Sequence, residues 1–148
     1  MSAASNYVED RTLDFWLKAN STTTTAPTTV YVALFTSADS TGGTAENLEA
    51  GTLTNECAGA GYNRKAVTFG AISNGSVSNS GNVTFDTATG NWGTITHVAV
   101  MDAEAHFQSG DSAGAGNVLY YGALTTAREI LTDDTFQITA GNLTISLA

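Results

Sequence analysis

The spacing of apolar residues near the start of the chain predicts one helix. Apolar or methyl-bearing side chains recur there at helical intervals, at Val8, Thr12, Phe15, Trp16 and Ala19. Asn6 and Glu9 have the spacing of a capping box in which Asn replaces the usual Ser or Thr. The threonine run at 22–25 and Pro27 then disfavour helix, because of β-branching and a missing N–H. We therefore expect a helix within residues 6–19.

From residue 29 onward the pattern changes to short β-branched and aromatic runs separated by Gly, Asn and Ser. This pattern is typical of antiparallel sandwiches and barrels. Strands are expected at 29–36, 62–69, 76–85, 94–102, 118–124, 135–139 and 143–147. The predicted fold class is mainly β, an antiparallel β-sandwich of jelly-roll-like or Greek-key type with one N-terminal α-helix.

Two turns are explicit in the sequence. Asn74-Gly75 is a type I′ hairpin signal, because both residues tolerate a positive φ. Ala140-Gly141-Asn142 separates the last two expected strands in a similar way. We expect the segments flanking each turn to be adjacent and antiparallel.

Two stretches, 37–61 and 103–116, do not read as strands and exceed the usual hairpin loop length. They are expected to be surface loops, and Leu48 and Leu53 predict a short helix or an edge strand inside the first. The length of 148 residues is about that of one domain. We expect a single domain, 1–148, with the sandwich spanning 29–148.

Charge and composition exclude several function classes. The formal net charge is −9, with 14 acidic and 5 basic residues, so neither nucleic acid nor a membrane surface is an expected partner. No stretch approaches the ~18 apolar residues that span a bilayer, and the first ten residues lack the pattern of a signal peptide. Synthesis in the cytoplasm is expected. Cys57 is the single cysteine, so no intrachain disulfide can form.

One motif resembles a hydrolase signature, since residues 110–114 match G-x-S-x-G around Ser112. No histidine follows Ser112, which excludes the order of the α/β-hydrolase triad. His97 and Asp102 precede it, as a chymotrypsin-like order requires, but they lie within one expected strand and its end, in a chain too short for that double barrel. We interpret the motif as a flexible Gly/Ser loop.

The remaining titratable residues give no catalytic or metal-binding pattern. His97 and His106 are the only histidines and match no common metal spacing. His97 is expected to be a half-buried sheet residue with a hydrogen-bonded ring, and Cys57 a thiol of raised pKa. The carboxylates form no calcium loop and predict a solvated acidic face; they are Asp39, Glu46, Glu49 and Glu56. We expect no enzyme, no catalytic residue, no cofactor and no metal.

Several runs in order along residues 7–147 carry a resemblance to a known family. They are YVED at 7–10 with Leu13, VYVALFT at 30–36, GYNRKAVTF at 61–69, VSN at 77–79, WGTITH at 92–97 and LYYGAL at 119–124. Together they resemble small virion proteins of tailed bacteriophages, often labelled tail-fibre proteins, with relatives that are similar to capsid decoration proteins. The resemblance implies a small β-sandwich and a structural role in the virion, with no catalytic residue to transfer.

Two virion roles follow from this resemblance. The first is a capsid decoration, or cement, protein that binds the major capsid protein as a homotrimer and bridges capsomers. The alternative is a tail or tail-fibre module that contacts other tail proteins and the host surface. The sequence alone leaves head and tail unresolved.

The predicted helix supplies the candidate interface residues. Phe15, Trp16 and Leu17 are adjacent and therefore point to different faces of the helix, and a sandwich covers one face more readily than all of them. With Tyr7, they are expected to contact a second subunit or the virion. The alternative is that Trp16 packs against its own sheet.

Overall fold

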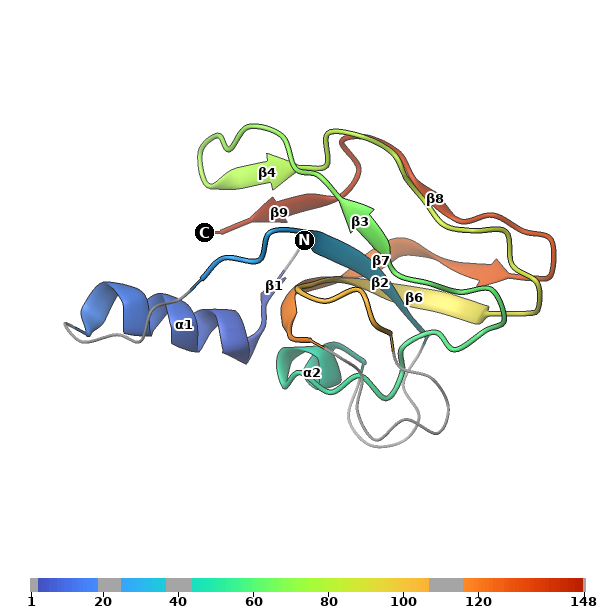
Figure 1. Ribbon diagram of the computed structural model, residues 1–148, viewed down its shortest axis with the longest axis horizontal. Helices are drawn as coiled ribbons and strands as arrows, with labels where there is room; N and C mark the ends of the chain where they lie inside the picture. The colour runs from blue at the N-terminus through green and yellow to red at the C-terminus, as the bar shows by residue number, and fades with distance from the viewer. Residues whose placement is uncertain (1–2, 19–24, 37–43, 107–115, 148) are drawn as a thin grey trace.

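The computed structural model describes residues 3–18, 25–36, 44–106 and 116–147 (Figure 1). The elements in chain order are β1 (Ala3–Ala4), α1 (Asn6–Leu17), β2 (Val30–Thr36), α2 (Thr44–Glu49), β3 (Lys65–Val67), β4 (Ser76–Ser78), β5 (Val83–Thr84), β6 (Gly93–Met101), β7 (Val118–Ile130), β8 (Gln137–Ile138) and β9 (Thr144–Ser146). Every strand pairing within this described part is antiparallel. The mainly β, antiparallel fold class is confirmed.

A five-stranded sheet in the order β1-β7-β6-β2-β3 forms the centre of the fold. Strand β2 has four consecutive buried residues, because both faces of this sheet are covered. Val32 and Leu34 belong to one apolar cluster, whereas Ala33 and Phe35 belong to a second on the opposite face. Alternate side chains of a strand point to opposite faces, so β2 separates two cores.

The larger core lies between the sheet and a layer made of two short ribbons, β4-β9 and β5-β8. Its centre is aromatic: Tyr62 stacks on Phe85 with centroids 6.1 Å apart and meets Trp92 edge-on at 5.5 Å. Ile95, Phe136 and other apolar residues complete this core. The two ribbons therefore form a second layer over one face of the five-stranded sheet.

Helix α2 covers the other face of the sheet, as Figure 1 shows below β2 and β6. Leu48 on the helix and Leu53 after it pack in one cluster with Phe35 and Met101. The sequence predicts either a short helix or an edge strand around Leu48 and Leu53. The structure has the helix. Residues 37–43 and 107–115 of the two expected long loops lie outside the described residues.

The prediction that the last two strands form a hairpin is wrong. β9 pairs with β4 and β8 pairs with β5, so residues 76–84 and 137–146 run alongside each other as one antiparallel ribbon with a corner. Gly141, at φ 83°, lies at this corner instead of at a chain reversal. Its amide donates to the carbonyl of Asn79, 2.9 Å away on the facing segment.

The expected single strand 76–85 is divided because Asn79 holds the corner. This buried side chain donates to the carbonyls of Gly81 and Thr139, at 2.7 and 3.1 Å, and its Oδ1 accepts from the amide of Leu143 at 2.9 Å. These bonds satisfy backbone groups that a continuous ladder would otherwise pair. The ribbon therefore bends without leaving those groups unpaired.

The Asn74-Gly75 turn is confirmed. Both residues have a positive φ, 49° and 72°, as a type I′ turn requires. Ser73 and Ser76 exchange two backbone hydrogen bonds of 2.9 Å across it. The flanking segments are therefore adjacent and antiparallel, as the sequence predicts.

Three further strands differ clearly from expectation, and the one expected at 135–139 is reduced to Gln137–Ile138. The strand expected at 62–69 is reduced to Lys65–Val67, because Tyr62 and Arg64 turn into the interior to make side-chain contacts. Strand β7 continues to Ile130, beyond the expected end at 124. Its pairing shifts between Ile95 and His97 of β6, so four residues, 124–127, bulge out opposite Thr96.

Candidate interaction surface

Helix α1 projects from the side of the sheet, and none of its residues is buried (Figure 1). Its last turns carry large apolar side chains that are more than half exposed: Leu13 at 55%, Phe15 at 57%, Trp16 at 75% and Leu17 at 75%. We call these four residues the helix tip. Trp16 does not pack against its own sheet, so the alternative left open by the sequence does not hold within this chain.

The helix tip is ordered by contacts among its own side chains. The rings of Phe15 and Trp16 meet edge to face, with centroids 5.1 Å apart. Lys18 Nζ lies 2.8 Å from the Asp14 carboxylate, which neutralises the charge beside the tip. Aromatic pairs in this geometry attract beyond their buried area. The tip is therefore an apolar end of the helix, with side chains on more than one face and little net charge.

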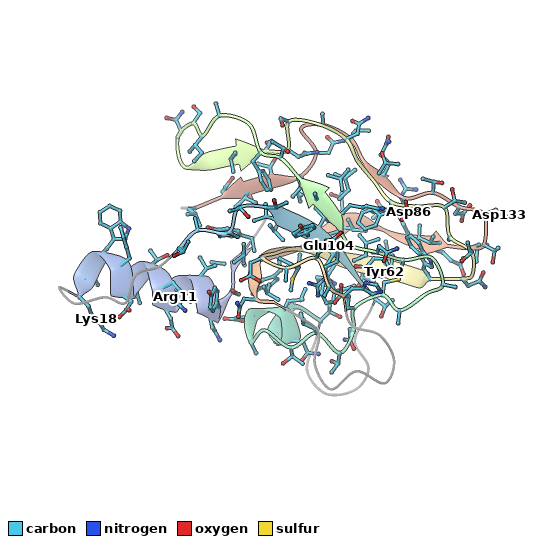
Figure 2. All side chains as sticks on the ribbon, viewed as in Figure 1. Arg11, Lys18, Tyr62, Asp86, Glu104 and Asp133 are labelled. Atoms are coloured by element: carbon cyan, nitrogen blue, oxygen red, sulfur yellow. The ribbon has the colours of Figure 1, made fainter. Side chains whose placement is uncertain are left out.

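Tyr7 lies at the opposite end of α1 from the other expected interface residues. It is half-buried at the base of α1, where the guanidinium of Arg11 sits 5.2 Å from its ring centroid. Figure 2 shows Arg11 partway along the helix and Lys18 at its far end. The structure brings Phe15, Trp16 and Leu17 together at the tip, and Tyr7 lines the same hollow along α1, of about 520 Å³, as Phe15 and Trp16.

The base of α1 is fixed to the sheet through Ser5 and β1. Ser5 is fully buried, donates its hydroxyl to the carbonyl of Val118, and accepts from the amide of Val8 at 3.5 Å as the N-cap of α1. Its own amide donates to Leu119 at 3.1 Å. Ser5, and not Asn6, is therefore the cap, so the predicted capping position is wrong by one residue.

A second apolar surface lies where the β4-β9 ribbon meets the main sheet. It is a groove of about 320 Å³. Two large side chains on it are strongly exposed, Ile72 at 78% and Leu147 at 59%. We call it the ribbon groove; it is lined by Val30, Phe69, Gly70, Ile72, Gly75, Ser76, Val77, Val100, Leu119, Tyr120, Ile145 and Leu147.

Sequence reasoning did not find the ribbon groove. Its lining comes from segments around residues 30, 69–77, 100, 119–120 and 145–147, which only the fold brings together. The available signal was Ile72, an apolar residue placed beside a polar turn. A strongly exposed apolar side chain at such a position marks a candidate contact surface.

A buried ion pair joins residues of the two expected loops to the core. Glu56 accepts from Arg64 Nε and Nη2 at 2.7 Å each, and from the Tyr62 hydroxyl at 3.1 Å. Arg64 Nη1 donates to the Ala103 carbonyl at 2.7 Å. Burial, and after it the Glu56 carboxylate, hold the pKa of Tyr62 well above its ordinary value. This cluster ties both expected loops to the core.

Of the residues considered for catalysis, the structure describes His97 and Asp102, and each has a hydrogen-bond partner of its own. Asp102 accepts from the backbone and side-chain nitrogens of Asn117, at 2.6 and 2.8 Å. His97 is half-buried, as expected; its Nδ1 lies 2.9 Å from Thr96 Oγ1, and burial lowers its pKa. The G-x-S-x-G motif lies outside the described residues.

Cys57 and the acidic residues give no reactive or metal-binding group in the described ranges. Burial, with a smaller contribution from Glu56, raises the pKa of the Cys57 thiol to about 11. Across residues 3–18, 25–36, 44–106 and 116–147, no group of three His, Cys, Asp or Glu residues is placed to hold a metal ion. Glu46 and Glu49 are exposed on α2, as expected of a solvated face. The same prediction is wrong for Glu56, which is buried because it pairs with Arg64, and Asp39 lies outside the described residues.

The sequence matches a known family of bacteriophage proteins over almost its whole length. The model of a family described as "podophage GP4 fiber I protein gp80" matches residues 3–146. The chain belongs to this fiber I family. The match confirms the resemblance to phage tail-fibre proteins, and it makes the chain a structural protein of a bacteriophage.

Further comparison adds little to the fiber I assignment. No curated protein matches the sequence significantly. Neither helix in the described part of this fiber I protein is long and apolar enough to cross a membrane. The exposed helix tip and the ribbon groove are thus surfaces of a phage fibre protein.

Proposed function

We propose that this chain is a non-enzymatic structural subunit of a bacteriophage tail fibre, which assembles with copies of itself through α1. The observation that carries the proposal is the helix tip, where Phe15, Trp16 and Leu17 are 57–75% exposed on a projecting helix. Exposed apolar clusters of this kind mark protein contact sites.

The fibre role is favoured over the capsid decoration role expected from the sequence. The matching family is described as a fiber protein, and the match spans residues 3–146. No feature of the described surface points specifically to a capsid shell. The proposed location is therefore the tail, with other tail proteins as partners alongside copies of this chain.

A closed homotrimer is the proposed assembly. Identical subunits that contact one another head to tail form closed rings when the rotation closes, and a threefold ring presents three projecting helices to one another's bodies. The charge of −9 opposes association everywhere except at surfaces without charge, and the helix tip is such a surface. The contact between subunits is therefore proposed to be apolar, with the helix tip at its centre.

Immunogold electron microscopy of intact virions tests the location. Antibodies raised against the purified chain are expected to label fibres at the tail, and the same antibodies absorbed with free protein provide the control. Label distributed over the head would contradict the tail proposal and favour capsid decoration. Analytical ultracentrifugation of the purified chain tests the trimer, and a monomer at all concentrations would contradict self-assembly.

A further inference from the structure

Exposed apolar side chains are concentrated on two surfaces of this chain. Among the described residues, seven large hydrophobic side chains are exposed. Four make up the helix tip, and two, Ile72 and Leu147, lie on the ribbon groove. Leu131 is the remaining one and lies at the far end of β7. An apolar projection and an apolar groove therefore coexist in one molecule.

The ribbon groove is suited to another copy of this highly acidic chain. None of its twelve lining residues carries a charge, although the chain has 14 acidic residues. Two copies with a net charge of −9 each repel over most of their surfaces. The helix tip is likewise neutralised by the Lys18–Asp14 pair. These two surfaces can meet without bringing unpaired charges of the same sign together.

The helix tip is shaped to enter a groove rather than to form a helical bundle. A bundle requires an apolar stripe that repeats along the helix. In α1 the exposed apolar residues are confined to 13–17, where Phe15 points away from the side that carries Leu13 and Leu17. The earlier turns carry Glu9, Asp10 and Arg11. Only the end of the helix is apolar.

The exposed area is appropriate for a stable contact. Fully covering an aromatic side chain buries roughly 150–250 Å². At an exposure of 75%, Trp16 alone offers on the order of 150 Å², about a fifth of the ~800 Å² that each partner buries in a standard interface. Leu13 and Leu17, on the same side of α1, add to this area, so this side of the tip supplies part of what a stable dimer contact needs.

The helix of one chain is held away from its own groove. Ser5 and the β1-β7 pairing fix the base of α1, and Figure 1 shows the helix projecting beyond the sheet, below the β4-β9 ribbon. Its tip stays exposed in this position. The helix tip of a neighbouring copy is a second apolar segment that can occupy the ribbon groove.

We propose that the helix tip of one copy inserts into the ribbon groove of a second copy, so that Trp16 and Leu17 pack against Ile72 and Leu147. The inference rests on the proposed self-assembly and names the surface that receives α1. In a closed ring each subunit then gives one helix and accepts one. The groove and the tip are covered together.

Cysteine cross-linking tests this contact directly. One chain carries Leu17→Cys and a second, differently tagged chain carries Ile72→Cys, both in a Cys57→Ala background. Both new thiols replace side chains that are 75% and 78% exposed, so the fold of each chain is expected to persist. Mixed chains treated with a short bismaleimide should give a product that contains both tags. Leu17→Cys mixed with Leu131→Cys is the matched control and should give none.

Three results would overturn the proposal. The first is an oligomer that forms in the mixture without any product between positions 17 and 72. The second is cross-linking of Leu17→Cys chains to one another in place of that product, which would show that the tips meet each other. The third comes from a separate variant that carries Leu17→Cys and Ile72→Cys on one chain: an internal cross-link in that variant, with no product between the two tagged chains, would show the helix folding onto its own groove.

The same experiment separates this inference from the proposed function. If the oligomer persists but the 17–72 product is absent, the tail-fibre subunit remains and only the receiving surface is wrong. If the chain is a monomer at every concentration and the product is absent, self-assembly itself fails. Immunogold location of the chain on the virion is independent of both results.

Discussion

Glu56 and Arg64 form a doubly bonded ion pair in which both side chains are completely removed from solvent. The two residues are eight positions apart, on segments that flank the buried Tyr62. Arg64 also reaches the carbonyl of Ala103, at the base of the second loop. The pair thus joins three parts of the chain at one point.

Replacing one residue of this pair should lower the free energy of unfolding more than replacing both residues. Glu56→Gln or Arg64→Met leaves a buried charge without its partner, a change that typically costs about 3–5 kcal/mol of unfolding free energy. The double variant Glu56→Leu/Arg64→Met should be more stable than either single variant. Urea unfolding curves of the three variants measure this, and additive losses in the double variant would contradict it.

Trp16→Ala should weaken self-association. Truncating a central aromatic anchor commonly costs ~2 kcal/mol or more, which corresponds to a Kd raised about thirtyfold. Glu46→Gln/Glu49→Gln is the control, because these carboxylates lie on α2, away from the helix tip. Sedimentation velocity across a concentration series gives the Kd of self-association for each of the two variants. An unchanged oligomer in folded Trp16→Ala protein would remove Trp16 from the interface.

Ser5→Ala should destabilise α1, whereas Asn6→Ala should be nearly neutral. Ser5 caps the helix and its buried hydroxyl bonds the Val118 carbonyl, so its loss costs about 1–2 kcal/mol. Asn6 is an exposed first helical residue. Hydrogen exchange at the Val8 amide reports on the cap. Equal effects of the two variants would contradict the assignment of Ser5.

Gly59→Ala should be strongly destabilising. A Cβ at this position would lie 2.2 Å from Trp92 Cδ1 and 2.8 Å from its Cα, so the buried indole would have to move. Overpacking of this kind costs roughly 1–3 kcal/mol or more. Gly81→Ala is the matched control, since nothing lies within 4 Å of its Cβ position. Thermal unfolding of both variants compares them.

The protein should lose stability as the pH falls through the range where His97 is charged in the unfolded chain. Burial lowers the pKa of His97 from 6.5, so the unfolded state binds the proton more readily than the folded state. The loss begins near the unfolded pKa and grows as the pH falls further. NMR titration of the His97 ring checks this, and a midpoint above 6.5 would contradict it.

The sequence predicts local features of this fold better than long-range ones. The helix pattern and the Asn74-Gly75 turn depend on neighbouring residues, and both are confirmed. The ribbon corner was missed because it depends on Asn79 bonding Thr139, sixty residues away. An Asn beside Ser and Gly looks like ordinary turn punctuation until its distant partner is known.

The candidate interface divides in the same way. Three of its expected residues, Phe15, Trp16 and Leu17, are exposed together because adjacent helical residues cannot share one face. The groove was invisible in the sequence, since it takes lining residues from five separate segments. The single-domain boundaries 1–148 and the trimer stay predictions.

The two-residue pairing of β1 with β7 has a mechanical consequence. On the N-terminal side of α1, a tensile load on the helix enters the sheet through Ala3, Ala4 and Ser5, which attach to Tyr120, Tyr121 and their neighbours. This attachment is far shorter than the pairing of β6 with β7. Under pulling, we expect β1 to separate from β7 while the pairing of β6 with β7 remains intact. The short strand β1 would then detach first, and the rest of the subunit would stay folded.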